Sequence, residues 1–194
     1  MVWHEEASLD GIDAVVVPGG FSYGDYLRAG AIARFAPVMD AVREFADRGG
    51  PVLGICNGFQ VLCEAGLLPG ALLPNDGLRF LCRQVDLEVV SNESAFTDGL
   101  EIGETLSVPV KHMSGRYFAP AGVLDELDAR GQVVLRYAPG QNPNGSSRDI
   151  AGVANERGNV MGLMPHPEHA VDPLTGSDDG LKLFAAVAKS AVAA

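Results

Sequence analysis

Two short, purely apolar runs mark the first third of the 194-residue chain. Residues 14–17 read Ala-Val-Val-Val and end at Pro18-Gly19-Gly20, and residues 51–55 read Pro-Val-Leu-Gly-Ile. Runs of this length and composition predict strands that are buried on both faces of a sheet. Apolar residues at helical spacing lie between them, where Pro37 is expected to start a helix and Gly49-Gly50 to end it.

The later part of the chain shows a different alternation. Residues 84–89 and 106–110 carry apolar side chains at every second position, which predicts strands with one wet face. Residues 150–154 and 160–164 flank the sequence Asn-Glu-Arg-Gly, which is a hairpin signal. A last helix is expected to begin at Ser177 as its N-cap. Together these elements predict a three-layer α/β fold with a mostly parallel sheet and an antiparallel patch, in which ligands collect at the carboxyl ends of the strands.

Composition narrows the function classes. The length suits one domain, residues 1–194, and 47% hydrophobic with 20% charged residues is typical of a soluble globular protein. No apolar stretch approaches 18 residues, so we expect no membrane span, and the net charge of −11 argues against a nucleic-acid partner. Three cysteines make neither a disulfide framework nor a zinc site and suit a reducing cytoplasm.

Cys56 stands in the pattern Gly54-Ile55-Cys56-Asn57-Gly58, between a predicted strand and a predicted helix. This is the nucleophile-elbow pattern with cysteine in place of serine, in which glycines make room for a sharp turn. The helix that follows points its free N–H groups at the sulfur, which favours the reactive thiolate, and the N–H of Asn57 can donate to an oxyanion. A small cysteine in a tight packing corner would also fit, as we expect for Cys63 and Cys82.

A general base for this cysteine is predicted at His166, in the sequence Pro-His-Pro-Glu. It follows the apolar run at 160–164, so it lies at the carboxyl end of a strand, whereas His4 and His169 are expected to be solvated. Two prolines restrict the backbone, and Glu168 is close enough to accept a hydrogen bond from one imidazole nitrogen while the other faces the sulfur. A rigid surface turn is the alternative. The backbone N–H groups of the Pro-Gly-Gly turn after the first strand offer a second oxyanion donor, although a plain glycine turn is commoner.

In this order the motifs resemble the class I glutamine amidotransferases. Residues 54–60, Gly-Ile-Cys-Asn-Gly-Phe-Gln, match the family's G-x-C-x-G-x-Q, and His166-Pro167-Glu168 matches its late H-x-E. Residues 19–33 and the run Asn142-Pro143-Asn144-Gly145-Ser146 further resemble the glutaminase subunits of phosphoribosylformylglycinamidine synthase. The resemblance covers nearly the whole chain and implies a flavodoxin-like fold.

The chemistry that the resemblance implies is hydrolysis of glutamine through a thioester. The cysteine attacks the carboxamide, backbone N–H groups hold the oxyanion, and the histidine protonates the departing ammonia and activates water. The residues that the resemblance assigns are Cys56, His166 and Glu168 for catalysis, the backbone of Gly20 and Asn57 for the oxyanion, and Gln60 for the glutamine pocket.

The resemblance also implies partners. A synthetase subunit would use the ammonia with ATP and Mg²⁺ to convert formylglycinamide ribonucleotide to formylglycinamidine ribonucleotide in purine biosynthesis, and a small third subunit would bridge the two. The chain carries no G-x-x-x-x-G-K-[ST] loop and no metal-ligand cluster, so we expect no cofactor or metal on it. The polar loop 139–149 is a candidate partner contact, although a solvated loop is commoner.

The chain departs from the family pattern in two places. Family members begin with a further strand and helix, and because the loss of a central strand would expose backbone edges, we expect a misplaced start codon or a fragment. Met113 follows His112 where the family has small or acidic residues, so the resemblance assigns His112 no role.

Two alternatives stay open. PfpI-like elbow-cysteine hydrolases place a histidine directly after the cysteine, where this chain has Asn57. A non-catalytic assembly subunit would bind the synthetase without hydrolysing glutamine.

Overall fold

The computed structural model describes the chain from Met1 to Ala193 and its side chains as far as Lys189. The helices are α1 (Pro37–Asp47), α2 (Asn57–Glu64), α3 (Ala121–Ala129) and α4 (Gly180–Ala193). The strands are β1 (Val15–Val17), β2 (Val52–Ile55), β3 (Ala71–Leu73), β4 (Leu81–Val89), β5 (Thr105–His112), β6 (Arg116–Phe118), β7 (Val133–Tyr137), β8 (Ile150–Ala154) and β9 (Val160–Leu163). A 3-10 turn, η4 (Pro167–His169), follows β9.

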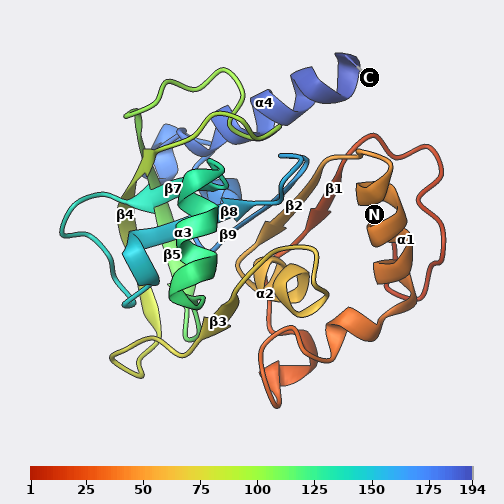
Figure 1. The fold of residues 1–194 in the computed structure, drawn as a ribbon, viewed down its shortest axis with the longest axis horizontal. Coiled ribbons are helices and arrows are strands. Elements are labelled where there is room, and N and C mark those ends of the chain that lie inside the picture. Colours follow the sequence, from red (N-terminus) through yellow and green to blue (C-terminus); the bar gives the residue numbers. More distant parts are fainter. Residues whose placement is uncertain (194) are drawn as a thin grey trace.

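Seven strands form one sheet in the order β1-β2-β9-β8-β7-β4-β5, and β3 pairs with β6 in a separate two-stranded sheet (Figure 1). Only β1, β2 and β9 pair in parallel, and the other four pairings of the large sheet are antiparallel. The α/β class is confirmed, but the antiparallel patch is larger than predicted. One reason is that the connection 155–159 is too short to carry a crossover between β8 and β9.

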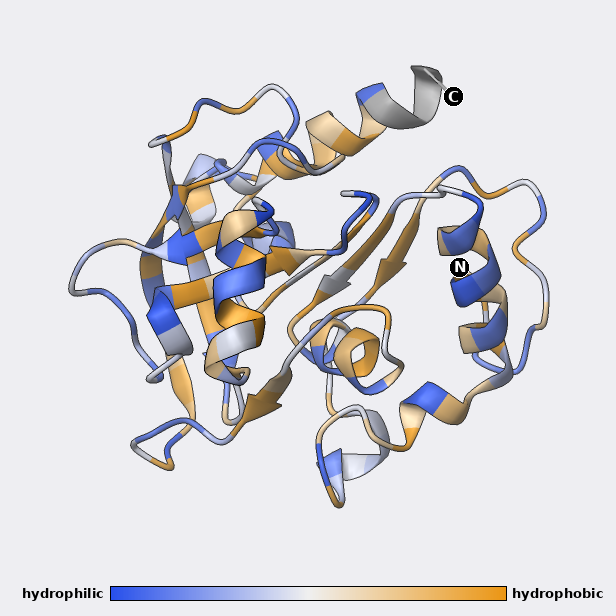
Figure 2. Cartoon of the chain, viewed as in Figure 1, coloured by the Kyte–Doolittle hydropathy of each residue, from blue (hydrophilic) through white to orange (hydrophobic). Residues whose placement is uncertain are grey.

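The core extends along the whole large sheet and includes its parallel end. Phe59 and Leu62 of α2, Val52 and Leu53 of β2 and Met161 of β9 have no exposed surface. Burial of each such side chain stabilises the fold by about 1.5–3 kcal/mol, so these contacts fix α2 against the strands. In Figure 2, β1 and β2 are largely hydrophobic, whereas α1 carries bands of hydrophilic and hydrophobic residues, as expected of a helix with one wet side.

Most of the predicted elements are confirmed. Helix α1 begins at Pro37, and the hairpin expected around 155–158 joins β8 to β9. The last helix begins at Gly180, and Ser177 makes the hydrogen bond expected of an N-cap, since its hydroxyl accepts from the Asp179 N–H at 3.0 Å. The pairing of β3 with β6 was not predicted, because strands of three residues carry no readable alternation.

Strand β1 is at the edge of the large sheet, and Val16 within it is exposed.

Among the helices of the described residues, none is long and apolar enough to cross a bilayer.

Candidate active site

Cys56 occupies the sharp turn between β2 and α2. Its backbone has φ 51° and ψ −104°, a conformation that costs a non-glycine residue about 1–3 kcal/mol. A Cβ on Gly58 would lie 1.9 Å from the carbonyl oxygen of Val17, and one on Gly54 would lie 2.8 Å from the carbonyl carbon of Gly58. Glycine at both positions therefore lets α2 begin directly against the ends of β1 and β2, which is the predicted elbow.

His166 and Glu168 form a hydrogen-bonded pair after β9. The imidazole Nδ1 lies 2.6 Å from Glu168 Oε1, so Nδ1–H donates and Nε2 keeps its lone pair. Within the described part of the chain, this buried Nε2 has no hydrogen-bond partner. The N–H of His166 donates to the Pro109 carbonyl at 2.8 Å, which anchors the backbone of this residue to β5. Nε2 is thus free to accept a proton.

Gly19 shows that Cys56 and the His166 ring lie close to each other. A Cβ built on Gly19 would lie 2.9 Å from His166 Cε1 and 3.6 Å from Cys56 Cβ. The two side chains therefore flank one point at the end of β1, although 110 positions separate them in the sequence. The structure brings together the cysteine, the histidine and the glutamate that the motifs singled out.

Two opposing effects act on the Cys56 thiol. Burial raises the pKa of Cys56 to about 12, and the negative charges of Glu168 and Asp25 act in the same direction. The backbone N–H of Asn57 lowers the pKa, as expected at a helix start, but burial outweighs it. The helix start therefore favours the thiolate, as predicted, but burial favours the thiol more strongly, and the sulfur has Lys111 O as a weak acceptor at 3.7 Å.

Glu168 is ionised in this arrangement. Burial alone would raise its pKa, but the hydrogen bond from His166 and a hydrogen bond from the backbone hold the pKa below its usual value. An anionic acceptor at Nδ1 fixes the imidazole tautomer and stabilises the imidazolium that forms when Nε2 takes a proton. The pair therefore has the character of a general base with its orienting group.

Asn57 and Gln60 connect the elbow to its surroundings. The Asn57 amide donates to Gln60 Oε1 at 2.8 Å and to Asp25 Oδ1 at 3.3 Å, and the Gln60 amide donates to Ser114 O at 2.5 Å. Gln60 is buried, and both the oxygen and the nitrogen of its side-chain amide are hydrogen-bonded within the protein. That Gln60 lines a glutamine pocket therefore stays a prediction. Gly20 is the second predicted oxyanion donor. It borders open space, because no atom lies within 4 Å of the point where a Cβ would be.

His169 is exposed, as predicted, and it lies beside the site. Its ring stacks on that of His166 at a centroid distance of 5.1 Å, and its Nδ1 is 3.0 Å from Lys111 Nζ. His166, Glu168 and His169 are spaced such that they could hold a metal ion. The ammonium of Lys111 beside His169 opposes a cation there, so the electrostatics do not favour a metal at this point.

Two residues of the run 142–146 point inward. Asn144 and Ser146 are buried, and they hydrogen-bond to Gly115 O at 2.8 Å and to the Tyr117 N–H at 3.0 Å. Asn144 and Ser146 therefore support the segment after β5, while Gly145 between them is exposed, and the loop 139–149 stays a candidate partner contact.

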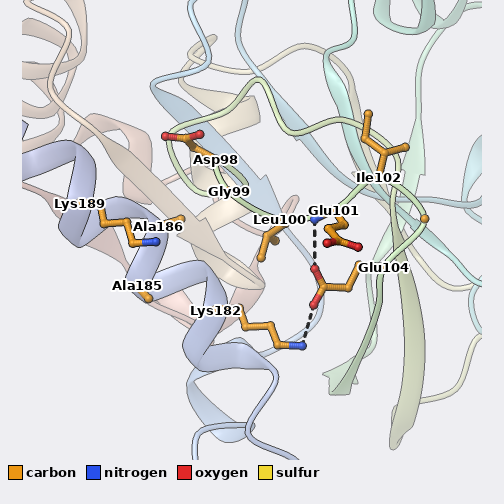
Figure 3. A pocket seen from close by; sticks show the side chains of 11 residues that line it. Asp98, Gly99, Leu100, Glu101, Ile102, Glu104, Lys182, Ala185, Ala186 and Lys189 are labelled. Atoms are coloured by element: carbon orange, nitrogen blue, oxygen red, sulfur yellow. Dashed lines mark hydrogen bonds and ion pairs between the residues drawn. The ribbon is translucent and has the colours of Figure 1, made fainter.

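A groove of about 680 Å³ lies between the loop 98–104 and α4 (Figure 3). Lys182, which lines it, is neutralised by Glu104 at 2.7 Å and by Asp179 at 2.9 Å. The groove shares no residue with the cluster around Cys56, so it is not part of the candidate active site.

Comparison with known proteins shows which family the chain belongs to. Residues 1–181 match the family of the CobB/CobQ-like glutamine amidotransferase domain. Over 184 residues the chain is 66% identical to the phosphoribosylformylglycinamidine synthase subunit PurQ of Mycobacterium tuberculosis, covering 94% of this chain and 81% of that protein. The subunit of the same name from Rhodococcus jostii is 60% identical over all 194 residues and 86% of its own length.

The fold has a solved counterpart. The structure of PurLQS from Thermotoga maritima contains a chain that superposes with a TM-score of 0.86 at 46% identity, covering 94% of this chain and 82% of that one. This likeness bears out the predicted three-layer glutamine amidotransferase fold.

Proposed function

Because the chain belongs to the CobB/CobQ-like glutamine amidotransferase family, we infer that it is the glutaminase subunit of a phosphoribosylformylglycinamidine synthase. It hydrolyses glutamine to glutamate and ammonia, and the ammonia serves the conversion of formylglycinamide ribonucleotide to formylglycinamidine ribonucleotide in purine biosynthesis. The observation that carries this function is the meeting of Cys56 and the His166–Glu168 pair at Gly19.

Attack on glutamine begins from a protonated sulfur. Cys56 passes its proton to Nε2 of His166 as the sulfur bonds to the carboxamide carbon, so charge develops only when substrate is present. The backbone N–H groups of Asn57 and Gly20 receive the oxyanion. His166 then gives the proton to the departing nitrogen, which leaves as ammonia and a thioester remains.

The second half of the reaction restores the thiol. His166 takes a proton from water as the water attacks the thioester, and it returns that proton to the sulfur as glutamate leaves. Glu168 remains ionised throughout and holds Nδ1–H, so the same nitrogen of His166 serves both steps. Gln60 borders the glutamine pocket.

The ammonia is used on other polypeptides. We assign ATP and Mg²⁺ to a synthetase subunit, and a small third subunit bridges the two in the cytoplasm, with no cofactor on this chain. The likeness to a chain of PurLQS supports an assembly of this kind. The two remaining functions are a non-catalytic assembly subunit and a PfpI-like hydrolase, and neither has a specific observation in its favour.

The test is glutamate release measured with and without the synthetase subunit, using wild-type protein and Cys56→Ala. We expect glutamine-dependent release that Cys56→Ala abolishes. Release by Cys56→Ala would contradict the mechanism, and binding to the synthetase without any release would favour the assembly subunit. A glutamine-mimicking diazo ketone should label Cys56 stoichiometrically, and free glutamine should protect it; labelling without protection would favour the PfpI-like hydrolase.

A further inference from the structure

Asn75 is a buried side chain with every polar atom of its amide engaged. It is 1% exposed, and its Nδ2 donates to Arg79 O at 2.9 Å and to His112 O at 3.0 Å. Its Oδ1 accepts from the Gly115 N–H at 3.0 Å and faces His112 Nδ1 at 3.1 Å. One asparagine thus connects both ends of the turn that follows β5.

These contacts fix the orientation of the amide and the tautomer of the histidine. A backbone N–H can only donate, so the atom of Asn75 that faces Gly115 must be the oxygen. The ring nitrogen of His112 that faces the same oxygen must therefore carry the proton. His112 is 3% exposed, and within the described part of the chain its Nε2 is buried without a partner. The imidazole is thus protonated on Nδ1 alone.

The turn held in this way forms a wall of the candidate active site. We call Lys111 to Gly115 the wall segment. Its first carbonyl, Lys111 O, faces the Cys56 sulfur at 3.7 Å, and its Ser114 carbonyl accepts from the Gln60 amide at 2.5 Å. A Cβ on Gly115 would lie 2.3 Å from His112 Cε1, so the imidazole packs directly against the backbone of Gly115 within the wall segment. A shift of this ring would move the carbonyls that face the elbow.

We propose that the hydrogen bond from His112 Nδ1–H to Asn75 Oδ1 sets the position of the wall segment, which makes His112 and Asn75 positioning residues for glutamine binding. The inference rests on the proposed glutaminase function and assigns work to two residues that the hydrolysis itself does not use. Neither residue exchanges a proton with the substrate. Their effect is on the shape of the pocket in which Cys56 meets the carboxamide.

The neutral state of His112 agrees with this role. Burial lowers the pKa of His112 to about 4, and the nearby His166 acts in the same direction. The ring therefore keeps one proton at neutral pH, and no second imidazolium opposes the positive charge that His166 acquires during the reaction.

Two substitutions of His112 distinguish the roles of its two ring nitrogens. The amide nitrogen of asparagine can take the place of Nδ1, whereas that of glutamine reaches the place of Nε2. We expect His112→Asn to keep a KM for glutamine near that of the wild type, whereas His112→Gln raises it by about tenfold with a much smaller change in kcat. Both are measured as glutamate release in the complete complex with the synthetase.

A second pair of variants controls for stability. Asn75→Leu should raise the KM for glutamine by about tenfold as well. Asn159→Leu is the matched control, because Asn159 is also buried and donates to two backbone carbonyls, of Ala46 and Gly50, at 2.8 and 2.9 Å before β9. It should lower the melting temperature without changing the KM. Should Asn75→Leu fail to fold, the histidine pair still decides the matter.

The results divide cleanly. Equal KM values for His112→Asn and His112→Gln would overturn the proposal, as would an imidazole ¹⁵N NMR spectrum that puts the proton of His112 on Nε2. The NMR measurement needs no turnover, so it tests the hydrogen bond from His112 Nδ1–H to Asn75 Oδ1 independently of activity. Failure of the wild-type complex to release glutamate, with the Nδ1–H tautomer present, would instead overturn the proposed function.

Discussion

The substitution Gly19→Ala tests the geometry of the reacting groups most directly. The backbone of Gly19 has no positive φ, so alanine fits the main chain there without strain. Its methyl group would lie 2.9 Å from His166 Cε1 and 3.6 Å from Cys56 Cβ, so it would contact both residues. The perturbation is therefore one carbon atom placed at the meeting point.

The size of the effect follows from the contact distances. Carbon atoms pack at about 3.5–4.0 Å, so the imidazole must move by roughly 0.5–1 Å to accept the methyl group. The ring is held by Glu168 at 2.6 Å and by the backbone bond to Pro109 at 2.8 Å, so it can move only by giving up part of these contacts. Misplacement of a catalytic group by about 1 Å can cost about 100-fold, and we expect kcat to fall by about 10- to 100-fold.

The assay is glutamate release by the complex, together with thermal unfolding of the subunit alone. Gly122→Ala in α3 is the matched control, because a Cβ there meets nothing within 4 Å and it too has no positive φ. Gly19→Ala should fold with nearly unchanged melting temperature and lose turnover, while the control keeps both. A Gly19→Ala subunit with the kcat of the wild type would refute the assignment of His166 as the base.

Three further predictions follow from the site. Alkylation of Cys56 by iodoacetamide without glutamine should be slow at pH 7 and rise about tenfold per pH unit to pH 9, because the thiol pKa is raised to about 12; a plateau in this range would show a resting thiolate. Glu168→Gln should lower kcat by about 10³-fold, since a neutral amide no longer fixes the His166 tautomer, and turnover within twofold of wild type would contradict this role. Gly58→Ala should lose about 3 kcal/mol or fail to fold, measured by urea unfolding, because its Cβ would lie 1.9 Å from the Val17 carbonyl; wild-type stability would contradict the elbow geometry.

The reacting residues could be predicted from the sequence because their constraints are local. The turn at Cys56 needs glycines two residues away on either side, and Glu168 is two residues from His166, so short motifs carry both arrangements. The protonation state of the thiol could not be predicted in this way. The helix that lowers the pKa is visible in the sequence, but the burial that raises it comes from packing against residues far along the chain.

The contact between Asn75 and His112 beside the site could not be predicted from the sequence for the same reason. Asn75 lies in a polar stretch, Asn-Asp-Gly, that reads as an ordinary turn, and its partner His112 is 37 positions away. Only the antiparallel pairing of β4 with β5 brings the beginning of one strand beside the end of the other. Pairing of this kind depends on how the sheet is ordered, and apolar alternation along each strand is compatible with more than one order.

Three glycines determine how closely the parts of the site approach one another. Gly58 lets α2 reach the end of β1, Gly19 lets the His166 ring lie beside Cys56, and Gly115 lets the His112 ring fold back against the wall segment's own backbone. A methyl group would collide with a different partner at each position: a backbone carbonyl, the general base, or the positioning histidine. Alanine at these positions should therefore affect stability, kcat and the KM for glutamine respectively. If all three variants lost only stability, the glycines would serve the fold alone, and the site would owe its shape to other contacts.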